Sequence, residues 1–461
     1  MALLETPTPS LAPQVELTPV VREFVADAVT PISAYLALAQ PGASCLLESV
    51  EGTDRISRRS FIGLDYLETR RFNGNPETIA AIRAMVKRYR TAGGAPFGGG
   101  AVCTFGYDAA RILDDVGEAP QAGLPCADAV VVVPGTWVVF DHFTHSGSLV
   151  GFARDEAERR EVERRLDGYV ERLMEQKPTL PGPVRSAGAV SASLTEREYR
   201  DRAEIAQKHI YEGDVYQLQL GIAYSCAFDG SPFDFYRRLR AANPSPYMFY
   251  IEDGERAIFG ASPEFLVRLD GSTARIRPLA GTRPRGETPA EDAKEARDLL
   301  ANPKEAAEHV MLVDLARNDL GKVCRTGSVR VDELMRIERY SHVMHIVSNV
   351  TGELRDECDA LDLFAASFPA GTVTGTPKLR AMQLIDELEP TARGHYAGSI
   401  AHLDFDGDMD SCIVLRSVVT DGGRAHWQAS AGIVADSDPR AEYAEVLHKT
   451  RIVRRVLGLE R

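Results

Sequence analysis

The sequence predicts an α+β protein in which helices pack on antiparallel sheets. Segments rich in β-branched and aromatic residues follow one another in pairs separated by turns, as in hairpins, and strict strand–helix alternation is absent. Segments with helical periodicity stand between these groups of strands, and no repeat of solenoid length occurs. The 461 residues are enough for one large core or two ordinary ones.

The N-terminal region carries mainly strand patterns. Residues 44–63 contain two apolar runs around a glycine-containing turn, which predicts a hairpin. Residues 97–108, FGGGAVCTFGYD, have neither a strand before the glycines nor a helix after them, so a phosphate-binding loop is not favoured. Residues 129–143 are strongly β-forming but broken by a Pro-Gly pair, which predicts two strands. Residues 156–176 are charged and helical by pattern.

A linker separates two regions of the chain. Residues 177–192, KPTLPGPVRSAGAVSA, are rich in Pro, Gly, Ser and Ala and lack periodic apolar positions. We therefore expect an N-terminal regulatory or partner-binding domain at 1–185 and a catalytic domain at 193–461. After the linker, Thr195 and a glutamate three residues later predict a capped helix that ends before Gly213. Beyond it, strands are predicted at 215–224, 247–252 and 257–269, and helices at 291–300, 304–320, 360–367 and 377–387.

Charge and cysteine content exclude several classes of protein. The net charge of -14 argues against nucleic-acid binding, and no basic run indicates a membrane surface. The seven cysteines are scattered without a CxxC pair, which favours reduced thiols over disulfides or zinc. The N-terminus lacks the features of a signal peptide, and no segment has the ~18 apolar residues of a membrane span. We therefore expect a soluble cytoplasmic protein.

Residues 428–449, QASAGIVADSDPRAEYAEVLHK, join a strand of small residues to a helix. The strand ends at Gly432, where little side chain keeps a ligand away from the backbone, and an Asp-Pro pair then begins the helix. Glu442, Glu445 and Lys449 share one face of that helix. Two carboxylates and one ammonium group suit a divalent cation with an anionic small molecule, although a solvated helix face has the same pattern.

A second helix repeats the pair of glutamates. In KEAAEHVMLVDLARNDLG, Glu305 and Glu308 are again three residues apart. Two such helices could supply four oxygen donors to one Mg²⁺ ion, with an inner pair and a water-mediated outer pair. The ExxE pattern is common by chance on helices, so the metal site needs further support.

A series of motifs supplies that support. SPEFLVRLDG, RPLAGTRPRG, EHVMLVDLARNDLG, ERYSHVMHIVSNVTGEL, FPAGTVTGTPKLRAM, LIDELEP and AGIVADSDPRAEYAEVLHK occur in this order. Together they resemble the chorismate-utilising enzymes, specifically the large subunits of anthranilate synthases. The resemblance runs from about residue 195 to the end and is looser before it, and it implies the layered α/β sandwich of that family.

The resemblance implies that chorismate is converted to anthranilate in two steps. Ammonia adds at C2 while the C4 hydroxyl leaves, and pyruvate is then eliminated. Glu264 matches the family's acid, and its pKa must be raised for it to be protonated near neutral pH. His345 matches the active-site histidine. His342 precedes it in an HxxH pattern, but no further zinc ligand follows at the usual spacing, so His342 is interpreted as structural.

The same resemblance implies how the metal and the substrate are held. Glu308 and Glu445 match direct Mg²⁺ ligands, with Glu305 and Glu442 in the outer shell. An arginine in the apolar segment CIVLRSVV is rarely unpaired, which independently suggests a nearby anion. The implied substrate-binding residues are Gln217, Thr372, Tyr396, Arg416, Ser430, Gly432 and Lys449.

Two positions separate this chain from other members of the family. Aminodeoxychorismate synthases have a nucleophilic lysine in PIKGT, where this chain has Ala280 in PLAGT, so no amine can attack from there. Isochorismate and salicylate synthases have a water-activating lysine where this chain has Gln217, and an amide cannot deprotonate water. An ammonia-using enzyme is therefore preferred.

The resemblance also implies a partner and an inhibitor. None of the seven cysteines lies in a nucleophile-elbow sequence, so a separate glutamine amidotransferase subunit is expected to supply ammonia. The segments LLES and NPSPYMFY match the family's tryptophan feedback pocket, although ordinary hairpin packing would also explain them. The matching residues are Glu48, Ser49, Pro246, Tyr247 and Met248.

Several positions depart from the family pattern. Ser430 replaces the first glycine of QAGAG, Thr376 replaces an alanine in TGTPK, GIAYS at 221–225 lacks the usual arginine, and His402 stands where a tyrosine commonly lines the tryptophan pocket. These departures leave three alternatives open. The chain could stop at aminodeoxyisochorismate, make aminodeoxychorismate, or bind chorismate or tryptophan without catalysis.

Overall fold

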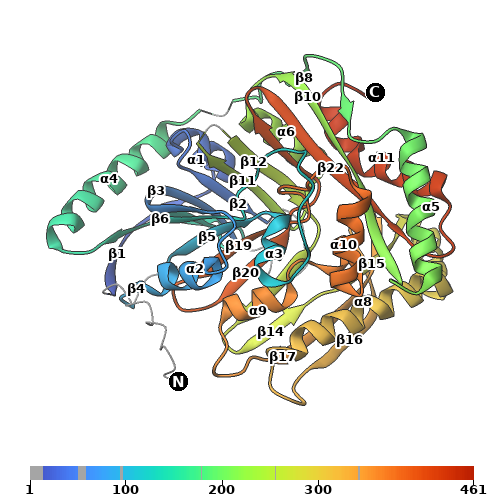
Figure 1. Cartoon of the computed structure of the whole chain (residues 1–461). Helices are drawn as coiled ribbons and strands as arrows, with labels where there is room; N and C mark the ends of the chain where they lie inside the picture. Colours follow the sequence, from blue (N-terminus) through green and yellow to red (C-terminus); the bar gives the residue numbers. More distant parts are fainter. Residues whose placement is uncertain are drawn as a thin grey trace.

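A computed structural model describes residues 14–49, 59–93, 97–177, 179–254, 256–340 and 343–460. Within these ranges the strands form one hydrogen-bonded system, and helices pack around it (Figure 1). Nearly all strand pairs are antiparallel, which confirms the α+β prediction; the pair formed by β1 (Val15–Val25) and β4 (Tyr89–Thr91) is parallel.

The strand β6 (Ala129–Asp141) connects two sheets. One of its edges pairs along the whole strand with β3 (Arg59–Phe72). The other edge pairs first with β5 (Gly100–Phe105) and then with β7 (Ser146–Ala153), which in turn pairs with β1. The two sheets therefore diverge from β6, one through β3 and the other through β5.

The sheet through β3 ends in a long strand pair. There β10 (Gln217–Asp229) runs antiparallel to β22 (Arg424–Ile433), and the short strands β8 (Arg185–Ser186), β9 (Ser191–Ala192) and β18 (Gly375–Thr376) also pair with β10. The strands that connect β3 to β22 are, in order, β2 (Cys45–Glu48), β11 (Tyr247–Asp253), β12 (Arg256–Ser262) and β21 (Ser417–Asp421).

The sheet through β5 ends at β17 (Val343–Glu353). This strand pairs with β14, β15 and β16, which gives a second curved layer beside the first. From β5 the order is β19 (Ser399–Asp404), β20 (Met409–Ile413), β13 (Phe265–Asp270), β14 (Thr273–Ile276) and β17, with β15 (Leu279–Pro284) and β16 (Arg330–Arg339) on β17.

Helices cover the outer faces of these sheets. Figure 1 shows α5 and α11 together beside β10 and β22, with α8 near β15 and β16. The predicted capping box at Thr195 is present, and Gly213 ends that helix with a left-handed φ of 88°. The helices are α1 (Pro31–Leu38), α2 (Thr78–Lys87), α3 (Ala110–Leu113), α4 (Glu156–Glu175), α5 (Glu196–Glu212), α6 (Pro232–Ala242), α7 (Pro289–Ala301), α8 (Pro303–Gly321), α9 (Ala360–Ser367), α10 (Lys378–Leu388) and α11 (Pro439–Val456).

Two strand predictions were wrong. Residues 129–141 form one strand, because a bulge between Tyr66 and Glu68 of β3 accommodates the Pro134–Gly135 step. Conversely, the single strand expected at 257–269 is two strands, β12 and β13, interrupted where Pro263 and Glu264 form a bend. The 44–63 hairpin is confirmed by the pairing of β2 with β3, and its turn at 50–58 lies outside the described residues.

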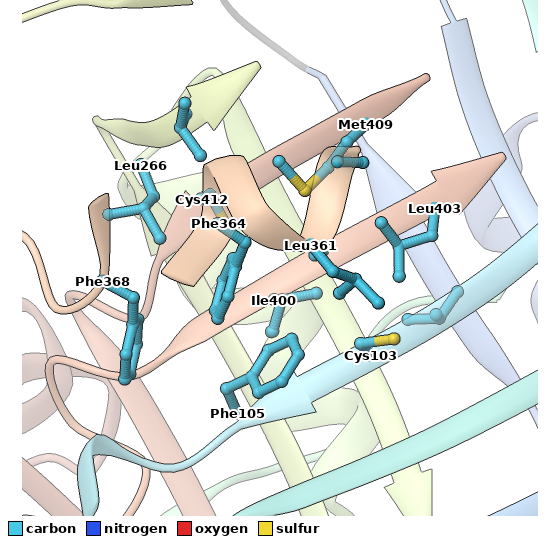
Figure 2. Packing of buried hydrophobic residues seen from close by; sticks show 14 of the residues in the cluster. Cys103, Phe105, Leu266, Leu361, Phe364, Phe368, Ile400, Leu403, Met409 and Cys412 are labelled. Atoms are coloured by element: carbon cyan, nitrogen blue, oxygen red, sulfur yellow. The ribbon is translucent and has the colours of Figure 1, made fainter. Parts of the chain in front are cut away.

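Two large clusters of buried side chains lie within these layers. In one of them Phe105 of β5 stacks on Phe364 of α9 with ring centroids 4.2 Å apart, and Phe364 stacks in turn on Phe368 (Figure 2). Ile400 and Leu403 of β19 belong to the same cluster, so residues from both ends of the chain share this core. The seven cysteines are free, as expected. No helix in the described ranges is long and apolar enough to cross a membrane.

The predicted division into domains at 1–185 and 193–461 stays a prediction. Strand pairs do link the two regions, since β2 pairs with β11 and β5 pairs with β19. The expected linker contributes the short strands β8 and β9 to the edge of β10.

Candidate active site

The pair of β10 and β22 presents a row of polar side chains on one face. Because side chains alternate along a strand, Leu218 and Leu220 enter the core while Gln217 and Gln219 project from the opposite face. The residue opposite Gln219 on β22 is Gly432. A Cβ atom on this glycine would stand only 2.6 Å from Nε2 of Gln217, so the sequence needs glycine there.

Glutamates from two helices lie above the Gln217 end of this face. On α8, Glu308 accepts a hydrogen bond of 3.1 Å from Nε2 of Gln217. On α11, Glu442 accepts one of 2.8 Å from Oγ of Ser437. Glu445, one turn further along α11, forms an ion pair of 2.7 Å with Lys449.

Repulsion between these carboxylates shows that the two helices face each other. Burial raises the pKa of Glu308, and the charges of Glu305 and Glu445 raise it further. Burial likewise raises the pKa of Glu442, with an added contribution from Glu445. Lys304 opposes both shifts through its own charge. The structure therefore brings together the four glutamates that the sequence analysis paired.

This donor set fits a hard cation. Oxygen ligands that repel one another gain most from a divalent ion between them, and Mg²⁺ keeps several waters beside one or two carboxylates. No three of these glutamates have ligand atoms within 4.8 Å of one another, which suits a site with water-mediated outer ligands. In the described residues that spacing is met by His209, Glu212 and Asp214, but Arg380 already donates to Asp214 at 3.2 Å.

Glu264 lies in the bend between β12 and β13. Its backbone is fixed by a hydrogen bond of 3.1 Å from the amide of Ile413 to its carbonyl and by the hydroxyl of Ser262. Burial raises the pKa of its carboxyl to about 8, and the nearby Thr372 hydroxyl lowers it slightly without reaching hydrogen-bond geometry. The carboxyl is therefore mostly protonated at neutral pH.

His345 on β17 is a neutral imidazole. Its Nδ1 lies 3.0 Å from Oγ1 of Thr282 and 3.1 Å from the carbonyl of Gly281, so Nδ1 carries the proton that this carbonyl accepts. Burial lowers the pKa of His345 to about 4, and the charge of Arg416 lowers it further. His345 can therefore form hydrogen bonds at neutral pH, but it is not a source of positive charge. His342 lies outside the described residues.

Arg416 is a buried cation without a counterion. Burial lowers the pKa of its guanidinium, and no side chain in the described ranges forms an ion pair or hydrogen bond with it. Its backbone has a left-handed φ of 47°. An unpaired buried charge is costly, so the position suits an anionic ligand.

Tyr396 and Ser430 contact each other. The Tyr396 and Ser430 hydroxyls are 2.7 Å apart, and Oγ of Ser430 donates to Oε1 of Gln219 at 2.9 Å. Lys449 donates from Nζ to the carbonyl of Ser430 at 2.9 Å. Tyr396, Ser430, Gly432 and Lys449, which were predicted separately, thus lie around one point of the β10–β22 face.

An internal ion pair supports this region and was missed by the sequence analysis. Arg393 and Glu389 are buried, 2.6 Å apart, and satisfied by further bonds to Gln219, Val373 and Gln428. Arg393 also lies over the ring of Tyr396, at 5.8 Å from its centroid. The i,i+4 spacing of Glu389 and Arg393, the former in LIDELEP, was the available signal.

The five residues predicted to bind tryptophan line a separate cavity of about 90 Å³. Glu48 is paired with Met248 in the β2–β11 ladder, and its carboxylate is held by Arg240 at 2.9 Å and by Tyr236 at 2.6 Å. His402, a departure from the family pattern, also lines this cavity. Oγ of Ser49 and Nε2 of His402 are buried without a partner among the described residues. The predicted lining residues are Glu48, Ser49, Pro246, Tyr247 and Met248.

Residues 43–455 match the model of the chorismate binding enzyme family. The chain belongs to this family. Anthranilate synthase component 1 of Streptomyces coelicolor is 43% identical over 465 residues, covering 96% of this chain and 89% of that protein. The component of the same name from Aquifex aeolicus is 40% identical, covering 97% of this chain and 96% of that protein. These relatives place the chain among the anthranilate synthase component 1 lyases of the family.

Solved structures agree. The crystal structure of anthranilate synthase component I from Streptococcus pneumoniae is 32% identical, with a TM-score of 0.78, covering 93% of this chain and 98% of that chain. The menaquinone-specific isochorismate synthase from Escherichia coli has a TM-score of 0.73 at 21% identity, covering 97% of both chains, and shares the fold.

Proposed function

We propose that this chain is the catalytic component of an anthranilate synthase and converts chorismate and ammonia to anthranilate and pyruvate. The buried Glu264, whose pKa is about 8, carries the proposal, because the departing C4 hydroxyl of chorismate needs a proton donor at neutral pH. In the first step the C2–N bond forms and the C4–O bond breaks. Glu264 protonates the leaving oxygen as water, and the ammonia nitrogen loses a proton.

The substrate is a dianion, and the site offers matching partners. Arg416 supplies a buried positive charge without a counterion, and Lys449 adds a second one beside Gly432. Neutral His345 can hydrogen-bond the ring. In the second step the C2 proton is removed and the enolpyruvyl C–O bond breaks, which yields the aromatic ring and pyruvate.

Glu308 and Glu445 would hold Mg²⁺ directly, with Glu305 and Glu442 in its outer shell. Their mutual repulsion and raised pKa values support this assignment. When bound, the ion would neutralise the ring carboxylate of chorismate. Gln217 would fix the direction of the Glu308 carboxylate through its hydrogen bond.

A glutamine amidotransferase subunit would supply the ammonia. The relatives are named component 1, which implies a second component in those enzymes. Ammonium salts at high pH would replace that subunit in a purified system. We place the complex in the cytoplasm, in line with the free cysteines.

Tryptophan would inhibit by binding the cavity beside Glu48. Its side chain would face Met248 and Pro246, and the unpartnered Ser49 hydroxyl is available as a polar contact. Tyr247 pairs in register with Ser262, whose hydroxyl contacts the backbone of Glu264. Binding at the start of β11 could therefore alter the position of the acid. A titration with tryptophan tests this part, since unchanged rates would rule it out.

The purified chain with chorismate, Mg²⁺ and an ammonium salt tests the main proposal, with products followed by fluorescence and mass. Anthranilate together with pyruvate is the expected result. An amino product that keeps the enolpyruvyl group would indicate an aminodeoxyisochorismate or aminodeoxychorismate synthase, and no turnover would indicate a binding module.

A further inference from the structure

Gln219 has no role in the reaction as proposed above, yet it lies in the middle of the site. It is the second polar residue of β10, it is buried, and its backbone is fixed on both sides. The amide donates to the carbonyl of Thr374 at 2.8 Å, and the carbonyl accepts from Arg393 at 3.0 Å. The side chain therefore starts from a rigid position.

A chain of hydroxyl groups determines which end of the Gln219 amide faces the site. Oγ of Ser430 donates to Oε1 of Gln219 at 2.9 Å, so Tyr396 donates in turn to Ser430 at 2.7 Å. All three side chains are buried. With Oε1 occupied, Nε2 of Gln219 is the end that remains, and it has no partner among the described residues.

Two amide nitrogens converge above Gly432. A Cβ atom there would lie 2.6 Å from Nε2 of Gln217 and 3.0 Å from Nε2 of Gln219. The Lys449 ammonium bonds to the carbonyl of Ser430, two residues away. Donors gathered in this way favour an anion with two oxygens, such as a carboxylate.

We propose that Nε2 of Gln219, oriented by Ser430 and Tyr396, is a hydrogen-bond donor to a carboxylate of the substrate. The inference rests on the proposed chorismate reaction and adds a specificity-determining residue to it. It also explains why Ser430 can stand where a glycine was expected: its hydroxyl contacts Gln219 and Tyr396, and its task is to orient the Gln219 amide.

Steady-state kinetics of Gln219→Leu test the proposal. A hydrogen bond to a charged group contributes about 1.5–3 kcal/mol, so KM for chorismate should rise about 10-fold to 100-fold. The kcat should change by less than about threefold and KM for ammonium should stay constant, because the bond is made equally in the ground state and the transition state. Ser430→Ala should raise KM less, and in the Gln219→Leu background it should add nothing.

Gln219→Glu covers the case in which the leucine variant fails to fold. It keeps the shape and the acceptor for Ser430 but replaces the donor by a carboxylate oxygen, so KM should rise further than in Gln219→Leu. An unchanged KM in either folded variant, or independent effects of the Gln219 and Ser430 changes, would overturn the proposal.

Gln428→Leu is the matched control. Gln428 is a buried glutamine on the same face of β22, and its Nε2 already donates to Glu389 at 3.1 Å. This variant should melt at a lower temperature with KM for chorismate unchanged, and an equal rise in KM would show general loosening and overturn the inference. If the wild-type chain makes no anthranilate, the proposed function fails instead, and chorismate binding followed by intrinsic fluorescence still decides the role of Gln219.

Discussion

Replacing Glu264 by glutamine separates its chemical role from its effect on stability. The substitution keeps the shape of the buried side chain and removes the proton that can be donated. General acids contribute about 10²- to 10⁴-fold to a rate, so kcat should fall by that factor. In the wild-type protein a pKa of about 8 means that about nine-tenths of the acid is protonated at pH 7 and about one-tenth at pH 9. The rate should therefore fall roughly tenfold for each pH unit above 8.

The same pKa makes a prediction about folding. Burial raises the pKa of Glu264 from 4.5 to about 8, and one unit corresponds to 1.36 kcal/mol, so ionisation in the folded state costs on the order of 4–5 kcal/mol. The protonated carboxyl contributes its full stability below about pH 4.5, and the contribution is lost as pH rises through 8. Glutamine has no such dependence. The variant should therefore gain stability relative to the wild type as pH rises from 6 to 9.

Two measurements check this reasoning. Initial rates with saturating chorismate and ammonium give the pH dependence of kcat, and urea denaturation across the same pH range gives the free energy of unfolding. A variant that loses activity but follows the wild-type pH dependence of stability would show that Glu264 is not held as a buried neutral acid. A variant with normal rates would remove it from the mechanism.

Three further substitutions test other parts of the site. Glu445→Ala should abolish Mg²⁺-dependent activity, and a magnesium titration that restores full rates would contradict the metal assignment. Arg416→Met should raise KM for chorismate about 10-fold or more while leaving the fold intact, because its charge has no counterion to strand; a stable variant with normal KM would exclude a substrate contact. Arg393→Met should destabilise the protein by about 3–5 kcal/mol in urea denaturation, since it leaves Glu389 buried and unpaired, whereas the double variant Arg393→Met/Glu389→Leu should regain much of that loss.

Local features of the site could be read from the sequence. The helix that carries Glu442 and Glu445 begins where the Asp438–Pro439 pair predicts, because capping depends on neighbouring residues alone. The two ExxE pairs share helix faces for the same reason. That the two faces meet across the site is a tertiary fact, and only the resemblance to a family predicted it.

Features that depend on distant residues were not predictable in this way. Gln219 and Ser430 are 211 positions apart and meet only because β10 and β22 pair in one register. The continuity of β6 through Pro134 depends on a bulge in another strand, β3. The neutrality of His345 follows from burial, which no spacing of residues in the sequence reveals.

The shared strand β6 bears on attempts to divide the molecule. A fragment that begins at residue 193 would lose β2 and β5, and β11 and β19 would then each present an open backbone edge. Exposed edges of this kind pair with other chains, so such a fragment should aggregate when expressed alone. Supplying residues 1–185 as a second polypeptide would cover both edges, which makes the protein a candidate for fragment complementation.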